Sequence, residues 1–440
     1  MRTGSKGLSL RDRPFRLVSA ALLLVGTALV PDRGTAQVVA IVNGEVHPVS
    51  GPVIRNGTVI ITDGRITAVG DNPTVPEGAQ VIDAAGMVVT PGFMDPLTPT
   101  GLVEINAASG TSDNVASDER ITAAFRVADA INYASTVIPV TRAEGLTSVG
   151  VAPSPGASIV GGQALVMDLG PGPTPDMVRR DPAAMIVVLG EQGSARSGGS
   201  RANAAARLRE IVSDARDYQA NRAAYRSGDR REYSLSHLDL EALGPVVDGE
   251  IPVVAYANRS SDIQAAIRIA DELDLELVIA GAAEGWLVAS DLAAAGVPVV
   301  IDPLRNLPTF DGLAATLENA GRLEAAGVEV IFSTFDAHNA RNIKQSAGNA
   351  VSYGMSHEGA LRAVTLGPAE LLGVSRIQGS LEVGKIGDVV VWSGDPFELS
   401  TQVRHLFIRG QETSLETRQK DLFRRYRDIG DVPPFRSGNR

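Results

Sequence analysis

The side chains that most often carry catalysis are few and scattered in this chain. It has no cysteine, which excludes disulfides, cysteine zinc sites and thiol catalysis. Asp336 and His338 are two residues apart, so both would face the same side if a strand continues that far. Two ligands make a weak zinc site, because zinc normally takes three protein ligands and a water. The other histidines lie far apart in the sequence, at His47, His237, His357 and His405.

Eight apolar runs rich in valine and isoleucine occupy the middle of the chain, as expected for buried parallel strands. They span residues 87–95, 146–151, 164–167, 184–189, 251–256, 276–280, 297–302 and 328–334. Helical patterns lie between them, at residues 204–227, 261–273, 286–295 and 313–326. This alternation predicts an α/β fold, a (β/α)8 barrel of the TIM type, whose catalytic groups would stand at the carboxyl ends of the strands. The third run is the least regular, because glycine and proline surround it.

Both flanks of this region have the pattern of an antiparallel sheet. Near the amino end, Asn56-Gly57 and Asp63-Gly64 separate short apolar runs and are strong hairpin signals. Residues 379–385, 388–392 and 403–410 repeat the pattern near the carboxyl end. We therefore expect one small β-sandwich built from residues 37–90 and 376–412, a barrel over residues 91–375 and a C-terminal extension over residues 413–440.

The first 36 residues have the features of a secretory signal peptide. Basic residues precede an apolar stretch over residues 17–30, and Gly34-Thr35-Ala36 supplies the small side chains that signal peptidase requires. The stretch is shorter than the about 20 residues that span a bilayer, which favours cleavage over a retained anchor. We expect a periplasmic or secreted protein that begins at Gln37 and has no membrane association after cleavage.

The composition and net charge of the chain argue against some classes of function. The hydrophobic fraction of 44% is that of an ordinary globular protein. The formal charge of −11 argues against nucleic-acid binding, which requires a basic face. No glycine-rich phosphate-binding motif follows a predicted strand, so nucleotide-binding functions lack support.

Several short motifs, in the right order, resemble those of the amidohydrolase superfamily. Residues 89–95 (VTPGFMD) resemble its first barrel strand. Three further segments resemble the imidazolonepropionase-like branch of the superfamily: residues 145–149 (GLTSV), 161–163 (GGQ) and 363–373 (AVTLGPAELLG). Residues 379–388 (GSLEVGKIGD) resemble the passage back into the sandwich. The resemblance covers residues 38–412 and implies a hydrolase of C–N bonds in amides, cyclic imides or peptide-derived compounds.

That family uses one or two divalent metals, such as zinc, at the mouth of the barrel. The metal lowers the pKa of a bound water and polarises the substrate carbonyl. The resemblance places the first-strand His-x-His pair at Leu97 and Pro99, the fifth-strand histidine at Tyr256 and the sixth-strand histidine at Gly281. None of the four is a histidine, so we expect no metal cofactor.

Two carboxylates fall near positions that the family uses. Asp336 keeps the place of the eighth-strand carboxylate, and Glu191 follows the fourth strand, where the family has an acidic or bridging group. The alternative for Asp336 is a structural hydrogen bonder, and for His338 a solvent-facing loop residue. The side chains that would contact a substrate are Tyr256, Asn258, Arg259 and His338.

Three hypotheses about function follow. The first is a secreted hydrolase of C–N bonds, which rests on the family resemblance. The second is a pseudoenzyme that binds a small amide ligand or a partner, either as a homo-oligomer or with an active paralogue. The third is a metal-free enzyme that uses Asp336, Glu191 and Tyr256 as acid–base groups. Such catalysis contributes roughly 10²–10⁴-fold, a small share of what amide hydrolysis requires.

Overall fold

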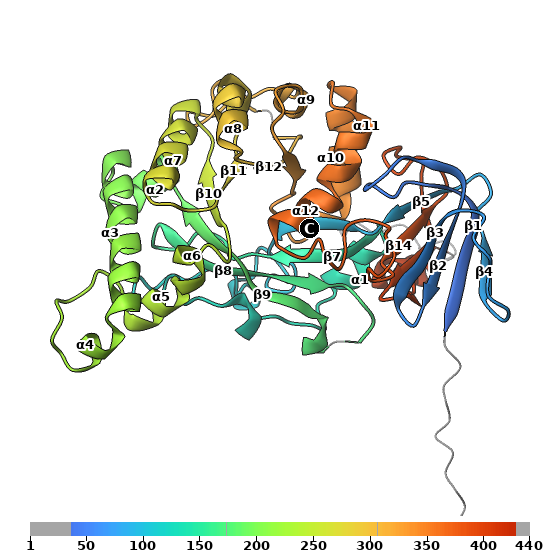
Figure 1. The fold of residues 1–440 in the computed structure, drawn as a ribbon, viewed down its shortest axis with the longest axis horizontal. Coiled ribbons are helices and arrows are strands. Elements are labelled where there is room, and N and C mark those ends of the chain that lie inside the picture. Colours follow the sequence, from blue (N-terminus) through green and yellow to red (C-terminus); the bar gives the residue numbers. More distant parts are fainter. Residues whose placement is uncertain (1–36, 173, 306, 428–440) are drawn as a thin grey trace, which may run out of the picture. The chain divides into compact units, whose positions relative to one another are not determined.

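The computed structural model describes residues 37–172, 174–305 and 307–427. Residues 1–36, on which the signal-peptide prediction rests, lie outside that part. Within the described part the strands form two sheets (Figure 1). No helix in the described ranges is both long and apolar enough to cross a membrane.

One of the two sheets is the barrel. Its strands pair in the order β6 (Phe93–Thr98), β7 (Leu146–Val151), β8 (Val160–Asp168), β9 (Val178–Val188), β10 (Val253–Ala257), β11 (Leu277–Gly281), β12 (Val299–Ile301) and β13 (Val330–Phe332). All residues of β6, β7 and β8 are buried, as their continuous apolar runs predicted. The predicted α/β barrel of eight strands is confirmed.

Strand β8 differs from the prediction of eight parallel strands. It runs antiparallel to both β7 and β9, whereas the other neighbours in the barrel are parallel. Residues 152–159 connect β7 to β8, and residues 169–177 connect β8 to β9. A parallel crossover needs roughly a dozen residues or more, so both connections are too short for one. Gly161 and Gly162 lie within β8 itself, and Pro153, Pro155, Gly156, Gly170, Pro171 and Gly172 lie in the two connections.

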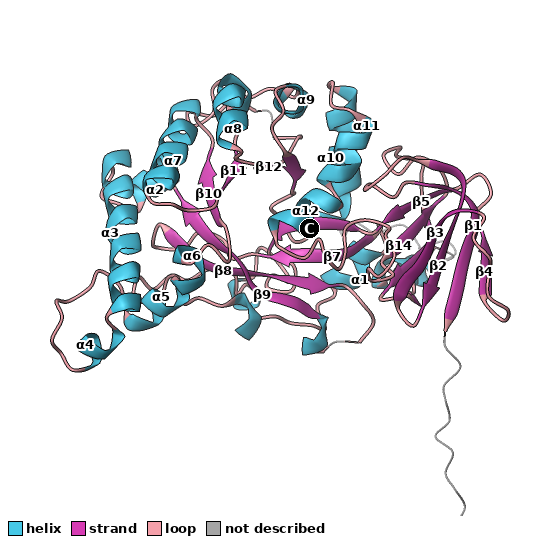
Figure 2. Ribbon diagram, viewed as in Figure 1, coloured by secondary structure: helices cyan, strands magenta, loops and turns pink. Residues whose placement is uncertain are grey.

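In Figure 2 the helices stand mainly to the left of and above the barrel strands. They are α1 (Val137–Arg142), α2 (Gly190–Ala195), α3 (Arg201–Ala220), α4 (Arg222–Arg226), α5 (His237–Ala242), α6 (Gly244–Val247), α7 (Ser260–Glu272), α8 (Ala289–Ala295), α9 (Asn319–Ala325), α10 (Ile343–Ser352), α11 (His357–Ala363) and α12 (Leu366–Leu371). The helix predicted from residue 313 begins only at Asn319. Ala314 is instead held by tertiary bonds, since its N–H donates to Glu284 and its carbonyl accepts from the Trp286 indole.

The second sheet combines both ends of the described chain, as predicted. Its order is β16-β15-β14-β5-β1-β2-β3, with β4 paired to β1 (Figure 1). The strands are β1 (Val38–Val46), β2 (Ile54–Thr62), β3 (Arg65–Asp71), β4 (Gln80–Asp83), β5 (Val88–Pro91), β14 (Val389–Trp392), β15 (Val403–Ile408) and β16 (Gln411–Glu412). Hydrogen bonds join them in one mixed sheet that encloses its own apolar cluster. The C-terminal extension then forms α13 (Arg418–Tyr426).

The run predicted as the first barrel strand is divided between the two sheets. Strand β5 pairs with β14 in the second sheet, and β6 pairs with β7 in the barrel. Gly92 stands between them, where a Cβ atom would lie 2.0 Å from the Thr147 hydroxyl oxygen. Only glycine allows the chain to pass from one sheet to the other at this contact.

A cluster of charged side chains lies where strands β8 and β9 of the barrel meet the second sheet. Asp168, at the end of β8 and fully buried, pairs with Arg179 of β9 and, at 3.6 Å, with Arg409 after β15. Asp388 accepts a 2.8 Å hydrogen bond from the Arg409 backbone N–H. Burial is the main cause that raises the pKa of Asp388 to about 7; the nearby Asp168 carboxylate acts in the same direction, and the Arg409 N–H and the two arginines oppose the shift. The cluster therefore holds a proton that an unfolded chain would release.

This cluster predicts a pH-dependent contribution to stability. An unfolded aspartate has a pKa near 3.8, so between about pH 4 and pH 7 the folded protein binds more protons at Asp388 than the unfolded chain. Relative to Asp388→Asn, the wild type should lose stability as the pH rises through that window. Urea unfolding of both proteins at about pH 5 and about pH 8 measures the difference. A pH-independent difference, like that expected for the exposed control Asp71→Asn, would contradict the assignment.

Candidate functional site

The interior of the barrel holds a cluster of apolar side chains, and it includes a residue that the family resemblance aligns with a metal ligand. Leu97 of β6 is 2% exposed and belongs to this interior cluster. The cluster also includes Met94, Ala164, Val166, Ala184, Ile186, Val254, Val278, Ala280, Val300 and Ile331, from β6, β8, β9, β10, β11, β12 and β13. Leu97 is therefore a core residue that packs against the other strands, and it offers no ligand atom.

Asp95 joins the two ends of the barrel sheet. Strands β6 and β13 end the path of backbone pairing. The Asp95 carboxylate, fully buried, accepts from the Ser333 hydroxyl at 2.6 Å and from the Thr334 hydroxyl at 2.6 Å and N–H at 3.0 Å. The Leu97 N–H adds a fourth donor at 3.3 Å. Burial raises the pKa of Asp95, and these hydrogen bonds oppose that shift.

Tyr256 of β10 is partly buried and packs against the same interior cluster. Its ring centroid is 5.8 Å from that of Phe335, and the Arg305 guanidinium stands over Phe335 at 5.7 Å. Burial raises the pKa of the Tyr256 phenol, so the hydroxyl stays protonated near neutral pH. Tyr256 can donate a hydrogen bond to a ligand but cannot serve as a base there.

The position that the family resemblance aligns with the sixth-strand histidine does not accommodate a histidine in this backbone. Gly281, the last residue of β11, has φ +93°, a conformation that residues with a Cβ rarely adopt. A Cβ atom here would lie 2.4 Å from the Asn258 side-chain oxygen. Asn258 in turn donates to Asp311 at 3.2 Å. The space of the missing imidazole is thus occupied by a hydrogen-bonded amide.

Asp336 and His338 do not share the face of a strand. Strand β13 ends at Phe332, and Phe335 takes a φ of +53°, which turns the chain before Asp336. The Asp336 carboxylate accepts from the N–H groups of His338 and Asn339, both at 2.8 Å, and so caps the following turn. The two side chains would face the same side only if the strand continued to His338, and β13 ends before that residue.

The remaining predicted residues lie along the rim, where charges compensate one another. Arg201 of α3 binds Asp262 at 2.8 Å and Asp311 at 3.3 Å. Burial is the main cause that raises the pKa of Asp311. The negative charges of Asp262 and of Glu191, in the first turn of α2, raise it as well. Arg259 has an exposed side chain and precedes α7. The structure therefore brings Asn258 and Glu191 near Asp311 and Arg201. It places Tyr256 elsewhere, beside Phe335.

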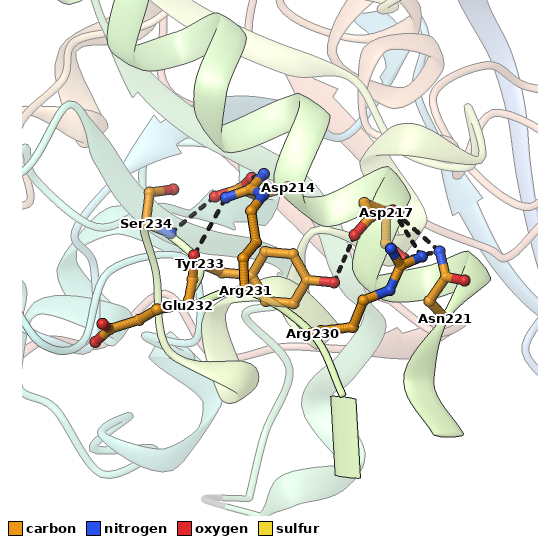
Figure 3. A network of polar contacts seen from close by, with 8 residues as sticks. All are labelled: Asp214, Asp217, Asn221, Arg230, Arg231, Glu232, Tyr233 and Ser234. Atoms are coloured by element: carbon orange, nitrogen blue, oxygen red, sulfur yellow. Dashed lines mark hydrogen bonds and ion pairs between the residues drawn. The ribbon is translucent and has the colours of Figure 1, made fainter. Parts of the chain in front are cut away.

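A further polar network, in the segment between β9 and β10, is structural (Figure 3). Asp214 of α3 pairs with Arg231 and accepts from the Ser234 N–H at 2.8 Å. Asp217, one turn later, accepts from the Tyr233 hydroxyl at 2.6 Å and from Arg230 at 3.2 Å. These contacts fasten residues 230–234 to α3 and lie on helices outside the barrel interior.

The residues at the mouth do not fit the metal centre of the family. Leu97 and Pro99 have no donor atom, Gly281 has no side chain, and the Asp336 carboxylate is engaged by two N–H groups. Across the described ranges, no three or more His, Asp or Glu side chains are grouped so that they could hold a metal ion. A zinc site would require at least three such ligands.

Sequence reasoning missed the residues that organise this region. Asp95 stood inside a recognised motif, but nothing in the pattern showed that its carboxylate meets Ser333 and Thr334. Arg201 and Asp311 lie in segments of ordinary composition, about 110 residues apart, and only folding brings them together. Contacts between residues that lie far apart in the chain leave no periodic pattern in either segment.

Removing the Asp95 carboxylate should open the junction between β6 and β13. Asp95→Ala leaves the Ser333 and Thr334 donors buried without an acceptor, which should lower the free energy of unfolding by about 3 kcal/mol or more. Asp95→Asn keeps one acceptor and should cost less. Chemical denaturation measures both, with the exposed Asp71→Ala as a control. Equal denaturation midpoints for Asp95→Ala and Asp71→Ala would contradict the role given to Asp95.

Comparison with known proteins supports the architecture. A sequence profile described as the amidohydrolase family matches residues 255–413. Amidohydrolase tasK of Hapsidospora irregularis is 25% identical over 388 residues, which cover 80% of this chain. The match spans only 39% of tasK, so this chain corresponds to about two fifths of that relative.

Solved structures agree with these sequence matches. An amidohydrolase from Thermotoga maritima MSB8 superposes with a TM-score of 0.76 at 28% identity, covering 86% of this chain and 99% of the other. A beta-aspartyl dipeptidase from Fervidobacterium islandicum shares the fold, with a TM-score of 0.54 at 13% identity over 86% of this chain and 96% of that one. Together with the barrel and its second sheet, these matches show that the chain belongs to the amidohydrolase superfamily.

Proposed function

We propose that this chain is an exported member of the superfamily that has lost the metal-dependent hydrolytic centre and acts as a binding protein or partner subunit. The observation that carries the proposal is the packing of Leu97 in the interior cluster. The family resemblance aligns Leu97 with a first-strand metal ligand. A buried leucine in a close-packed core contributes to stability, and replacing it with a ligand would disturb that packing.

The substitutions form a consistent set on three strands. Leu97 fills space, Tyr256 extends the apolar cluster toward Phe335, and Gly281 yields its side-chain space to Asn258. Each replacement has its own packing or hydrogen-bonding role, so restoring one histidine would not rebuild a ligand set. This supports a barrel retained for binding.

Metal-free acid–base catalysis has less support. Asp336 caps a turn, Glu191 lies near Arg201 and Asp311, and the phenol of Tyr256 stays protonated. No contact in the described residues joins these three groups. Even with ideal placement, acid–base catalysis supplies only roughly 10²–10⁴-fold.

The ligand that we propose is a small amide bound at the mouth of the barrel. Tyr256 offers a protonated hydroxyl beside the Phe335 ring, and the Arg305 side chain is mostly exposed above it. A phenol donor suits an amide carbonyl, and an aromatic pair suits an apolar substituent. Hydrolysis of the same class of compound, which the names of the relatives suggest, is the competing hypothesis.

Metal content and turnover separate these two functions. Purified protein should contain far less than one equivalent of zinc, manganese or iron by elemental analysis. Calorimetry with N-acyl amino acids, dipeptides and cyclic amides should detect binding of at least one compound, with no release of amine. Binding should weaken in Tyr256→Phe, which removes only the hydroxyl donor, and the chelator EDTA should change nothing.

Two control variants locate any metal that is found. Asp336→Asn and His338→Ala remove the two potential ligands after β13. One equivalent of metal in the wild type that is lost in either variant would overturn the proposal. Turnover that disappears with EDTA and returns with zinc would overturn it as well.

Export can be tested independently of the binding function. The full chain expressed in a Gram-negative host should accumulate in the periplasm, and mass spectrometry should find Gln37 as its first residue. Ala36→Arg, which places a large charged side chain at the cleavage site, should block processing. An intact amino terminus at Met1 in the cytoplasmic fraction would contradict export.

A further inference from the structure

A recess of about 550 Å³ lies outside the barrel interior, where α10, the start of β15 and α13 meet. Its lining includes Glu144, which precedes β7, and Arg341, in the 3-10 turn before α10. Lys344 of α10 and Lys420 of α13 complete its charged residues. Its volume is within the range of roughly 300–1,000 Å³ that small-molecule pockets occupy.

The lysine on the floor of the recess already has a counter-charge. Lys344 is 6% exposed, and its ammonium pairs with the Glu144 carboxylate at 2.7 Å. It also donates to the Thr401 carbonyl at 3.4 Å and lies 5.8 Å from the centre of the Trp392 ring. This pair therefore forms a neutral floor.

The other two cations lack such compensation. The Lys420 ammonium donates to the Leu415 carbonyl at 2.8 Å, which is a neutral acceptor. No carboxylate among the described residues lies within ion-pairing distance of Arg341. Two positive charges thus face one recess in a chain whose formal charge is −11.

The recess also has an apolar side. Leu399, Val403 and Leu415 line it, and Leu399 is 77% exposed. Gln345 and Gln402 add amide groups that can donate or accept hydrogen bonds. Such a wall suits a ligand with an apolar body better than it suits a hydrated inorganic ion.

We propose that this recess binds a small organic anion, with its acid group between Arg341 and Lys420. The planar guanidinium of arginine matches a carboxylate or phosphate with two parallel hydrogen bonds, and lysine adds a point charge. The apolar body of the ligand lies against Leu399, Val403 and Leu415. The site is separate from the mouth of the barrel, so it does not depend on whether the mouth binds an amide.

Calorimetry on the full chain tests the site with three probes: octanoate, benzoate and inorganic phosphate. Octanoate or benzoate should bind saturably with one equivalent, more tightly than phosphate, and more weakly as salt screens the two charges. Arg341→Gln and Lys420→Gln should each lower the affinity about tenfold or more, a change of about 1.4 kcal/mol. Arg55→Gln, which alters an exposed arginine on β2, should bind like the wild type.

Three results would overturn the proposal. The first is the absence of saturable binding for all three probes, and the second is binding that Arg341→Gln and Lys420→Gln leave unchanged. The third is phosphate binding as tight as octanoate binding, which would refute the apolar contact. Arg341→Lys guards against a folding defect, because it keeps the charge and should retain more affinity than Arg341→Gln.

Discussion

The buried carboxylate of Asp95 is the contact on which the barrel depends. A sheet that curls into a barrel must satisfy the polar groups where its first and last strands meet, because these groups are removed from water. Here four hydrogen bonds to one side chain do this, three of them from Ser333 and Thr334 after the last strand. Burial of the charge is costly, and the short hydroxyl contacts offset that cost. The junction is therefore stable only while every donor keeps its acceptor.

This junction bears on the proposed loss of the metal centre. Asp95 and Leu97 lie on the same strand, two residues apart, with one closing the sheet and the other filling its interior. Tyr256 and Phe335 continue the apolar filling upward, while Asn258 and Asp311 extend a hydrogen-bonded rim. Leu97, Tyr256 and Gly281, which the family resemblance aligns with metal ligands, thus have different physical roles. The chain keeps the architecture of its superfamily, and packing and hydrogen bonds hold these positions in it.

Charge is distributed unevenly over this fold. Acidic and basic side chains compensate each other at the rim and along α3, where Arg201, Asp214 and Asp217 each have partners. Asp168 and Asp388 bring a proton-sensitive cluster to the contact between barrel and second sheet. In the recess beside α13, by contrast, Arg341 and Lys420 face open space with little compensation. Unpaired charge of one sign in a concave site favours a ligand of the other sign.

The sequence alone determined the barrel, the second sheet made from both flanks and the absence of histidine at four positions. Continuous apolar runs, hairpin dipeptides and ordered motifs are local features, and their meaning does not depend on distant contacts. Local patterns did not determine the reversed direction of β8, which follows from connections too short for a crossover. They also did not determine that β13 ends at Phe332, so that Asp336 and His338 do not share the face of a strand. Only tertiary structure placed Asp95 against Ser333 and Thr334, and Arg201 against Asp311. Such contacts join residues more than 100 positions apart, and their geometry exists only once the strands have packed.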